Sequence, residues 1–483
     1  MIGVALLMSN ALELVPYAVA IIAGSLVGIL TGSIPGIHVN LVAALVAASF
    51  PALDQPNLAL PAVLFVVAVA TVHSFFDIIP TVFVGVPGDE AHSLLPGHRM
   101  VRAGRGMDAV HFSAIGSWYG LLLGLAVMAL LLVIGQHRVD AVVGYLNDVM
   151  FWLLLGAATL IIVTDKHRGW AFGIFVVSGM FGILIFATPL IPGGTNAPIS
   201  TLFPALTGLF GMSGLILSLG DKAPTLPEQQ ASTEKIRLDS SVAPALINGA
   251  VGGMVVGVLP GLGSANAATL LSLGRRTRQG IDNDIGYIVT TSAISTTDAM
   301  FSIAALYLLG STRSGASVAI DRIIPEFNQQ PLWTVVAVGV AILTAGYVGR
   351  QLLLFLGLRL AKFVGRMNYR ALSVGVIAAL ISIVWATTGW WGLLILFGTT
   401  ALGMVAPLAG VRRAQAMGMF LVPTILYFSG KSAAVVSALR IEAVNLPPPE
   451  VDLGFLLSVV GASALVGAVV YHIVKVVLSS ADV

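Results

Sequence analysis

Charge is scarce in this 483-residue chain, and cysteine is absent. Without cysteine there are no disulfides, iron–sulfur clusters or catalytic thiols. Only 10% of the residues are Asp, Glu, Lys or Arg, which is too little polar surface to coat a soluble particle of this size. The 57% hydrophobic content and the mean hydropathy of +0.97 therefore predict an all-α polytopic membrane protein.

Several enzyme motifs are also missing. The chain has no Gly-x4-Gly-Lys-Ser/Thr loop for ATP hydrolysis and no His-Glu-x2-His run for an intramembrane zinc protease. Asp77 lacks the preceding Gly-x-Gly of intramembrane aspartyl proteases. We therefore predict that the protein is not an enzyme and has no cofactor. The formal net charge of +2 gives no reason to expect a nucleic-acid partner.

Apolar segments follow one another in two series, separated by a polar stretch that contains Pro224 and Pro227. We therefore predict a first membrane repeat over 1–220, a polar linker over 221–242 and a second membrane repeat over 243–483. The expected apolar segments are 12–34, 37–50, 61–85, 112–134, 150–164, 170–190, 202–219, 243–259, 262–274, 285–310, 332–360, 371–389, 391–409, 414–429 and 453–477.

One broken-helix motif occurs in both halves. The pattern Gly-x3-Gly-x2-Pro-Gly begins at Gly28 and again at Gly253, 225 residues later. Proline removes a backbone donor and clashes with the preceding turn, so both helices should break. A slightly smaller offset pairs Asp77 with Asp298. We predict two homologous, inverted repeats with broken or re-entrant hairpins, since paired breaks mark transporter substrate sites. Inversion requires an odd number of spans in each repeat.

The half-helices after the two breaks predict an anion site. Their first amide N–H groups lack intrahelical partners, and the helix dipole adds positive charge. Alternatively, each Pro-Gly is only a packing kink. Arg313 follows as a candidate bidentate ligand or an ordinary interfacial anchor. The predicted substrate-binding residues are Pro35, Gly36, Ile37, His38, Asn40, Pro260, Gly261, Leu262, Gly263, Ser264, Asn266 and Arg313.

Asp77 and Asp298 lie within apolar segments, where an uncompensated carboxylate is costly in free energy. A hydroxyl-rich stretch precedes Asp298 and suits oxygen ligation of a cation. Alternatively, the hydroxyls bond back to their own helix and the acids cap broken ends. His38 and His73 are candidates for a proton relay or for structural hydrogen bonds. The predicted ion-coupling residues are Asp77, Asp298, Ser295, Thr296 and Thr297, with Na⁺ and H⁺ both open as the coupling ion.

Five runs of the chain carry a family resemblance. They are Pro35–Asn40, Val86–Glu90, Pro96–Gly106, Phe203–Ser213 and Gly252–Asn266. In order and spacing they look like the large membrane subunit of the tripartite tricarboxylate transporters, the TctA family. The resemblance implies a two-repeat secondary transporter that moves carboxylates by using an ion gradient. It also implies two partners, an extracytoplasmic solute-binding protein and a small four-helix membrane subunit.

The chain also departs from the usual pattern of that family. Tyr-Gly-Gly-Ser is usual where this chain has Phe75 to Ile78, and Gly-Ile-Pro-Gly is usual where it has Leu309 to Arg313. His38 stands where a second glycine is typical. The chain thus resembles a divergent, archaeal branch, in which the substrate and the need for a solute-binding protein stay open.

We therefore predict a multi-pass protein of the cell membrane that acts as a symporter for a di- or tricarboxylate, with alternating access around the paired breaks. The alternative is a polyprenyl-phosphate lipid-carrier translocase, because a lipid phosphate also offers an anion to helix N-termini. A permease needs a closed, water-fed site, whereas a flippase needs a groove open to lipid. Membrane lipids are expected neighbours, and a homodimer is left open.

Overall fold

The structure is a computed structural model of the 483-residue chain. It describes residues 2–34, 38–53, 55–83, 96–134, 136–187, 201–219, 227–229, 242–259, 267, 281–366 and 369–441. Within these ranges, every regular element is a helix. The predicted all-α class is therefore confirmed. The last expected apolar segment, 453–477, and most of the expected linker lie outside the described residues.

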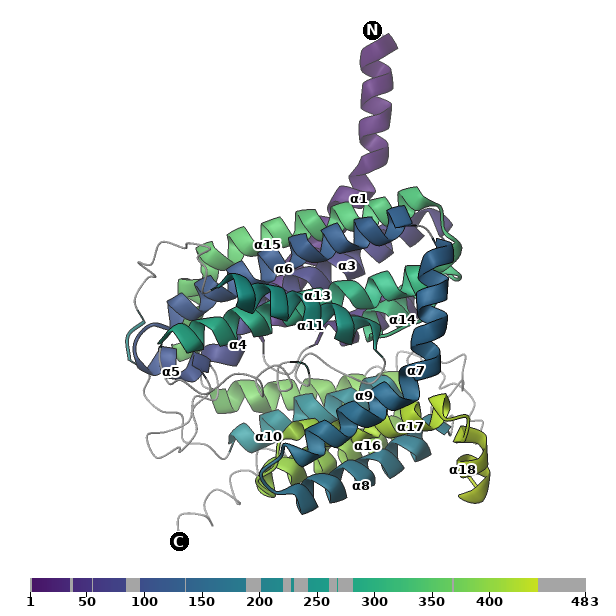
Figure 1. Cartoon of the computed structure of the whole chain (residues 1–483). Coiled ribbons are helices and arrows are strands. Elements are labelled where there is room, and N and C mark those ends of the chain that lie inside the picture. The colour runs from purple at the N-terminus through teal and green to yellow at the C-terminus, as the bar shows by residue number, and fades with distance from the viewer. Residues whose placement is uncertain are drawn as a thin grey trace.

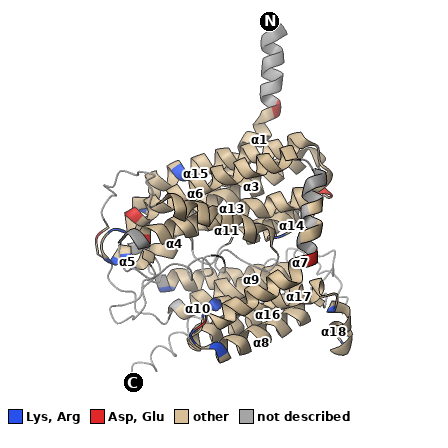
Figure 2. Cartoon of the chain, in the orientation of Figure 1, with Lys and Arg blue, Asp and Glu red and all other residues tan. Residues whose placement is uncertain are grey.

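The described helices have the length and composition of membrane spans. Seven are long and apolar enough to cross a bilayer, or eight if the bent pair Arg413–Phe428 and Ser432–Ala438 counts as one span. Figure 2 shows that charged residues lie mostly at helix ends and in loops. The seven candidate spans are Glu13–Ser33, Pro56–Phe83, Gly106–Ile134, Arg168–Ala187, Asp284–Leu309, Leu332–Phe363 and Arg370–Leu408.

The helices form two layers, with α7 running from one layer to the other (Figure 1). The upper layer holds α3 (Ala59–Phe76), α4 (Ile78–Phe83), α5 (Pro96–Arg102), α6 (Gly106–Ile134), α11 (Ala243–Val258), α13 (Ile281–Leu309), α14 (Gly315–Ile323) and α15 (Leu332–Arg366). The lower layer holds α8 (Arg168–Ala187), α9 (Leu202–Leu206), α10 (Ser213–Leu219), α16 (Tyr369–Leu408) and α17 (Gly418–Phe428). The remaining helices include α1 (Ile2–Ser33), α2 (Val39–Leu53), α7 (Gln136–Val163) and α18 (Ser432–Ala438).

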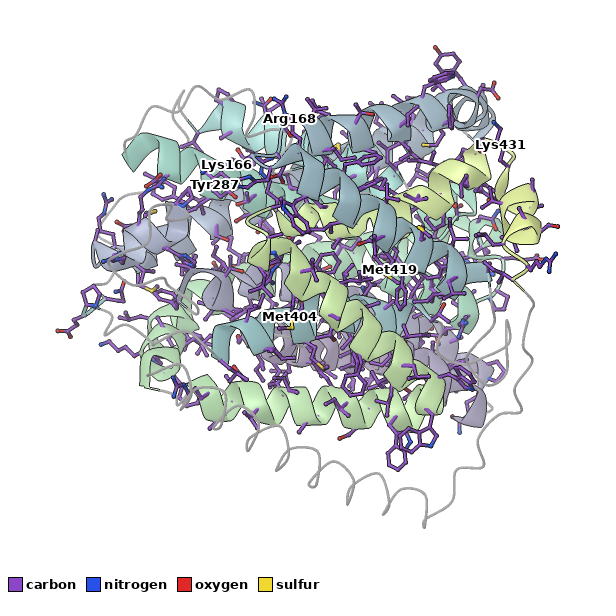
Figure 3. The ribbon with its side chains drawn as sticks, turned by 90° about the horizontal axis from the view of Figure 1, so that it is seen from below. Lys166, Arg168, Tyr287, Met404, Met419 and Lys431 are labelled. Carbon is purple, nitrogen blue, oxygen red and sulfur yellow. The ribbon has the colours of Figure 1, made fainter. Side chains whose placement is uncertain are left out.

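The lower layer has an apolar middle between charged ends. Lys166 and Arg168 lie toward one end and Lys431 toward the other, with Met419 between them (Figure 3). The long helix α16 bends at Gly389, whose φ of 63° is in the left-handed region that favours glycine. This bend separates the two expected segments 371–389 and 391–409.

In the upper layer, α1 packs closely and in parallel against α3 through glycines one turn apart. A Cβ on Gly28 would lie 2.8 Å from Val72 Cβ and 2.9 Å from the carbonyl oxygen of Val69. A Cβ on Gly32 would lie 2.7 Å from Phe76 Cβ. Only glycine leaves room for two helix backbones to come this close, which is a common way to join helices in a bilayer.

The pair α11 and α13 packs in the same way. A Cβ on Gly253 would lie 2.5 Å from the carbonyl oxygen of Ile294, and a Cβ on Gly257 would lie 2.7 Å from Phe301 Cβ. Each residue in these contacts stands 225 positions after its counterpart in α1 or α3. The two helix pairs therefore pack through equivalent positions that lie 225 residues apart. We call this shared alignment the packing register.

The next long helix of each half packs on the other half. α6 lies against α13, where a Cβ on Gly116 would be 2.5 Å from the carbonyl oxygen of Val289. α15 lies against α3, where a Cβ on Gly346 would be 3.7 Å from Thr71 Cγ2. The two halves of the chain are thus interleaved in the upper layer. This arrangement brings α3 and α13 into direct contact.

In the lower layer, Asp165 ties the turn between α7 and α8 to the short helix η5 (Arg413–Met417). Its Oδ2 accepts hydrogen bonds from the Arg412 backbone N–H at 3.1 Å and from Gln415 Nε2 at 3.0 Å. Burial raises the pKa of Asp165, but the hydrogen bonds from Gln415, Arg412 and His167 outweigh burial and hold this pKa below its usual 3.8.

We expect Gly253→Ala to loosen α11 from α13. The added Cβ would lie 1.9 Å from Thr297 Oγ1, so the helices must shift at a cost of roughly 1–3 kcal/mol. Gly156→Ala on α7 is the matched control, because a Cβ there meets nothing within 4 Å. Thermal melting in detergent should show a lower midpoint for Gly253→Ala only. Equal midpoints would mean that the close approach is absent.

We expect Asp165→Asn to destabilise the protein at neutral pH by roughly 1–3 kcal/mol, because an ionised acceptor is lost. A carboxyl whose folded pKa is depressed stabilises fully above its unfolded pKa, and this contribution disappears as the pH falls through the folded value. Melting midpoints of wild type and variant should therefore converge once the pH falls below the usual 3.8. A constant gap across that range would contradict the assignment.

Candidate functional site

Both predicted helix breaks fall where a described helix ends. α1 ends at Ser33 and α2 begins at Val39, while α11 ends at Val258. Leu259 is already extended, with φ −80° and ψ 125°, as expected for a residue before proline. The predicted break and anion-site residues themselves, Pro35, Gly36, Ile37, Pro260, Gly261, Leu262, Gly263, Ser264 and Asn266, lie outside the described residues.

Asn40, a predicted substrate residue on α2, contacts Gly315, which lies two positions after the predicted substrate residue Arg313 of the other half. A Cβ on Gly315, the first residue of α14, would lie 2.7 Å from Asn40 Cγ on α2. Ser314 caps α14 through a capping box with Ser317. Arg313 immediately precedes this cap, and its backbone N–H donates to Ser317 Oγ at 2.8 Å. The beginning of α2 and the Arg313 loop therefore lie next to each other in the fold.

Arg313 is a half-buried cation at this place. Its Nε is fully buried and has no hydrogen-bond partner among the described residues. Burial lowers the pKa of the guanidinium below its usual range, although an arginine in a protein stays charged at neutral pH. Since an unpaired buried charge is costly, the guanidinium is chemically suited to an anionic ligand.

A pair of histidines also lies near the start of α2. The ring centroids of His38 and His73 are 5.1 Å apart. His38 Nδ1 accepts the backbone N–H of Asn40 at 3.3 Å, and His73 Nδ1 is 3.0 Å from Thr31 Oγ1 on α1. The two imidazoles thus connect the beginning of α2 to the contact between α1 and α3.

Hydroxyl and carboxyl groups join α3 to α13. Ser295 Oγ donates to Asp77 Oδ2 at 3.2 Å, and Ser74 Oγ donates to Thr296 Oγ1 at 3.3 Å. Asp77 stands at the junction of α3 and α4, as the capping alternative expected, but its carboxylate accepts from another helix. Thr297 Oγ1 instead bonds back to the carbonyl oxygen of Ala293 at 2.6 Å, as the other alternative expected.

The packing contacts follow the offset of 225 residues and not the smaller offset that pairs Asp77 with Asp298. A Cβ on Gly28 would lie 3.2 Å from His73 N, and a Cβ on Gly253 would lie 3.0 Å from Asp298 N. Asp298, which is half-buried on α13, therefore occupies the position of His73. By the same register, Ser302 occupies the position of Asp77. The offset obtained by matching residue types therefore differs from the packing offset by about one helical turn.

Some polar residues of this region were not predicted from the sequence. Thr31 follows Gly28 by three residues and so lies on the helix face that meets α3. Ser302 Oγ donates to Ser314 Oγ at 3.0 Å, which links α13 to the cap beside Arg313. The glycine spacing is the signal that could have revealed Thr31. Nothing in the sequence pairs Ser302 with Ser314.

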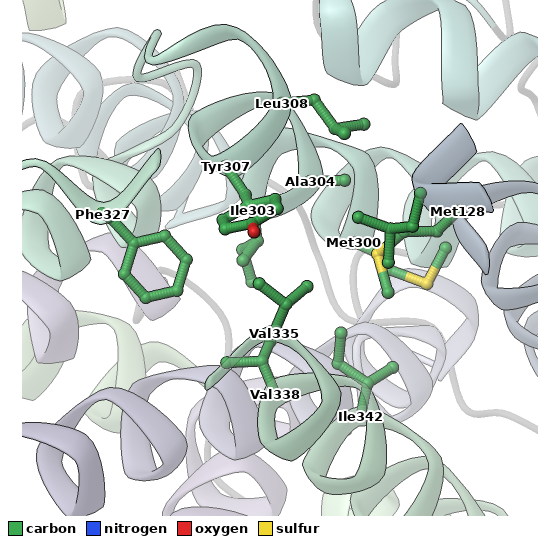
Figure 4. A pocket seen from close by; sticks show the side chains of 11 residues that line it. Met128, Met300, Ile303, Ala304, Tyr307, Leu308, Phe327, Val335, Val338 and Ile342 are labelled. Atoms are coloured by element: carbon green, nitrogen blue, oxygen red, sulfur yellow. The ribbon is translucent and has the colours of Figure 1, made fainter. Parts of the chain in front are cut away.

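A small cavity between α6, α13 and α15 is apolar and does not provide an anion site. Met128, Met300, Ile303, Val338 and Ile342 are among the side chains that point into it (Figure 4). In the described part of the chain, no three His, Asp or Glu side chains gather as a metal site would require. The polar contacts of the predicted site residues lie instead along α3, α13 and the start of α2.

Comparison with known proteins identifies the family. Residues 18–418, most of the chain, match the sequence profile of the tripartite tricarboxylate transporter TctA family. The chain is also similar to an uncharacterized protein of Methanocaldococcus jannaschii, with 26% identity over 413 residues that make up 84% of this chain and 98% of that protein. This archaeal relative agrees with the expected branch. No solved structure matches the chain. The protein is thus a multi-pass membrane component of a transporter, not an enzyme, and belongs to the TctA family.

Proposed function

We propose that the protein carries a small di- or tricarboxylate across the membrane as the large subunit of a secondary transporter driven by an ion gradient. Membership of the TctA family supports transport in general. The observation that favours an anionic substrate is the meeting of Asn40, at the start of α2, with the loop of Arg313. The unpartnered Arg313 Nε is a donor for a carboxylate, and the positive end of the α2 helix dipole adds to the attraction.

The origin of these donors in different halves suggests how the site opens. An anion held by both α2 and the Arg313 loop would add a bridge between the halves that an empty site lacks. Alternating access in such transporters is a rocking of one repeat against another around a fixed site. We include the internal duplication in this proposal, because α1–α3 and α11–α13 share one packing register.

The contact between α3 and α13 supports ion coupling. Asp77 and Ser295 face each other across it, and Asp298 lies one helical turn beyond Ser295 on α13. A carboxylate with hydroxyl neighbours can ligate Na⁺ or exchange H⁺, and either change alters the charge buried between the halves. Coupling follows because substrate and ion then favour the same arrangement of the halves.

We also propose the two partners that the family implies. An extracytoplasmic solute-binding protein would deliver the carboxylate, and a small membrane subunit would cover part of the apolar surface. Family membership supports both partners in general, since the family description is of a tripartite transporter.

A binding screen tests the choice of substrate. Purified full-length protein in nanodiscs would be titrated with citrate and succinate, and separately with undecaprenyl phosphate in the nanodisc lipid. We expect saturable binding of at least one carboxylate. Binding of the prenyl phosphate alone would replace the proposal with a lipid-carrier translocase. Binding only of neutral or cationic solutes would exclude both functions.

We expect Arg313→Gln to weaken citrate binding by about 10- to 100-fold, because a charge-assisted hydrogen bond contributes roughly 1.5–3 kcal/mol. Arg322→Gln on the following helix is the matched control for the general electrostatic field, and its affinity should stay within about twofold of wild type. The same titration calorimetry measures both variants. Equal losses for the two arginines would mean that Arg313 acts only through long-range charge.

We expect Asp77→Asn and Asp298→Asn each to abolish accumulation of citrate against a gradient while exchange of labelled citrate continues. An amide keeps the size of the side chain but can neither release a proton nor carry the charge that balances Na⁺. Asp148→Asn at an exposed position on α7 is the control. Uptake into proteoliposomes gives the measurement. Full accumulation by either variant would remove that aspartate from the coupling mechanism.

A further inference from the structure

We propose that His73 is the proton-coupling residue of the first half, and that it takes up its proton when the anionic substrate binds. This inference rests on the proposed function and adds a residue to it. It identifies H⁺ as a coupling ion and assigns the proton to an imidazole on α3. The observations that carry it are the packing register, the hydrogen bond of His73 and its contact with His38.

The packing register gives each half one ionisable side chain at the same position. His73 N meets the glycine face of α1 as Asp298 N meets the glycine face of α11, with Cβ contacts of 3.2 Å and 3.0 Å at Gly28 and Gly253. Ionisable residues inside membrane helices are rare and mark ion pathways. The equivalence makes His73 the counterpart of an acid already expected to carry an ion.

The hydrogen bond of His73 defines which nitrogen is available. Thr31 Oγ1 is 3.3 Å from the carbonyl oxygen of Gly28, to which its hydroxyl donates. With the Thr31 hydroxyl directed at Gly28, we assign the 3.0 Å contact between His73 Nδ1 and Thr31 Oγ1 as a hydrogen bond that Nδ1–H of His73 donates. A neutral His73 thus carries its proton on Nδ1, and Nε2 is the atom that receives the coupling proton.

His38 connects this imidazole to the substrate site. Its ring lies 5.1 Å from the ring of His73, and its Nδ1 accepts the backbone N–H of Asn40. His73 is buried, with 9% of its surface exposed, whereas His38 is exposed. His38 is therefore the imidazole through which a proton would pass between the start of α2 and His73. Two imidazoles this close hold one proton between them far more readily than two.

Charge compensation explains why the substrate and the proton bind together. A buried imidazole with no anion nearby favours its neutral form, because burial penalises the charged one. A carboxylate bound at the start of α2 adds negative charge beside His38 and stabilises an imidazolium on this pair. The anion and the proton then bind together, and their combined net charge is smaller than that of the anion alone. Transport of both in the same direction is symport.

Other ionisable groups on the elements packed against α3 contribute to any pH profile. The described ones are Glu13 and Tyr17 on α1, Asp108, His111 and Tyr119 on α6, Asp284, Tyr287, Asp298 and Tyr307 on α13, Asp321 and Arg322 on α14, and Tyr347, Arg350, Arg359 and Lys362 on α15, besides Asp77 at the end of α3 itself. Among these, only His111 has an ordinary pKa near neutrality. His111→Gln is therefore the matched control.

Citrate titration of the purified full-length protein between pH 6 and 8 tests the inference. Calorimetry in two buffers of different ionisation enthalpy counts the protons taken up. Wild type and His111→Gln should take up about one proton per citrate, so their affinity tightens by up to about tenfold per pH unit of acidification. His73→Gln should lose this proton uptake and show only the shallow pH dependence that citrate itself gives, because its last carboxyl titrates at the acidic end of this range. A thermal midpoint close to that of wild type would show that the variant is folded.

Proton uptake that persists in folded His73→Gln would overturn the inference. Citrate binding without proton uptake in wild type would also overturn it, while leaving carboxylate transport intact. If no carboxylate binds, the proposed function fails first. The ¹⁵N NMR signals of the free protein then test the assignment of His73 directly. The signal missing from His73→Gln should belong to an Nδ1–H tautomer, and an Nε2–H tautomer would contradict the assignment.

Discussion

The close approach of α1 to α3 and of α11 to α13 is the constraint on which the upper layer depends. Lipid tails are as apolar as leucine, so helices in a bilayer gain little from hiding apolar surface and associate through packing and polar contacts. Glycines at Gly28, Gly32, Gly253 and Gly257 let the backbones meet without a side chain between them. The polar residues at those levels, His73 and Asp298 among them, are thereby held at fixed depths in the layer.

Interleaving of the two halves then determines where polar groups find partners. Asp77 on α3 accepts from Ser295 on α13, and Ser74 on α3 donates to Thr296. Each bond crosses from one half of the chain to the other. Loss of its partner leaves a buried polar group desolvated and without a hydrogen bond, which is costly in free energy. The halves therefore cannot move apart unless an ion, water or substrate replaces these bonds. In the proposed mechanism, the same contacts that stabilise the fold would therefore tie the movement of the halves to ligands.

The sequence predicted the local features better than the long-range ones. Apolar run lengths located the helices, and proline explains why Leu259 is extended. The meeting of Asn40 with Gly315 was not predictable, because it depends on how α2 packs against α14. Packing pairs Asp298 with His73 instead of with Asp77, because the predicted pairing matched residue types whereas packing aligns positions. The equivalence of His73 and Asp298 could not be found by comparing residue types, because the two residues differ.

This difference between the halves has a physical consequence for the proposed mechanism. If both halves carried aspartate at this position, the loaded site would hold two negative charges and a carboxylate substrate in a medium that penalises each of them. With His73 in one half and Asp298 in the other, protonation of the imidazole adds a positive charge next to the helix that bears the acid. The loaded state then has less net charge to move through the membrane. In the proposed mechanism, a change of residue between equivalent positions would thus allow an anion to cross with a proton, without requiring the two halves to bind the same ion.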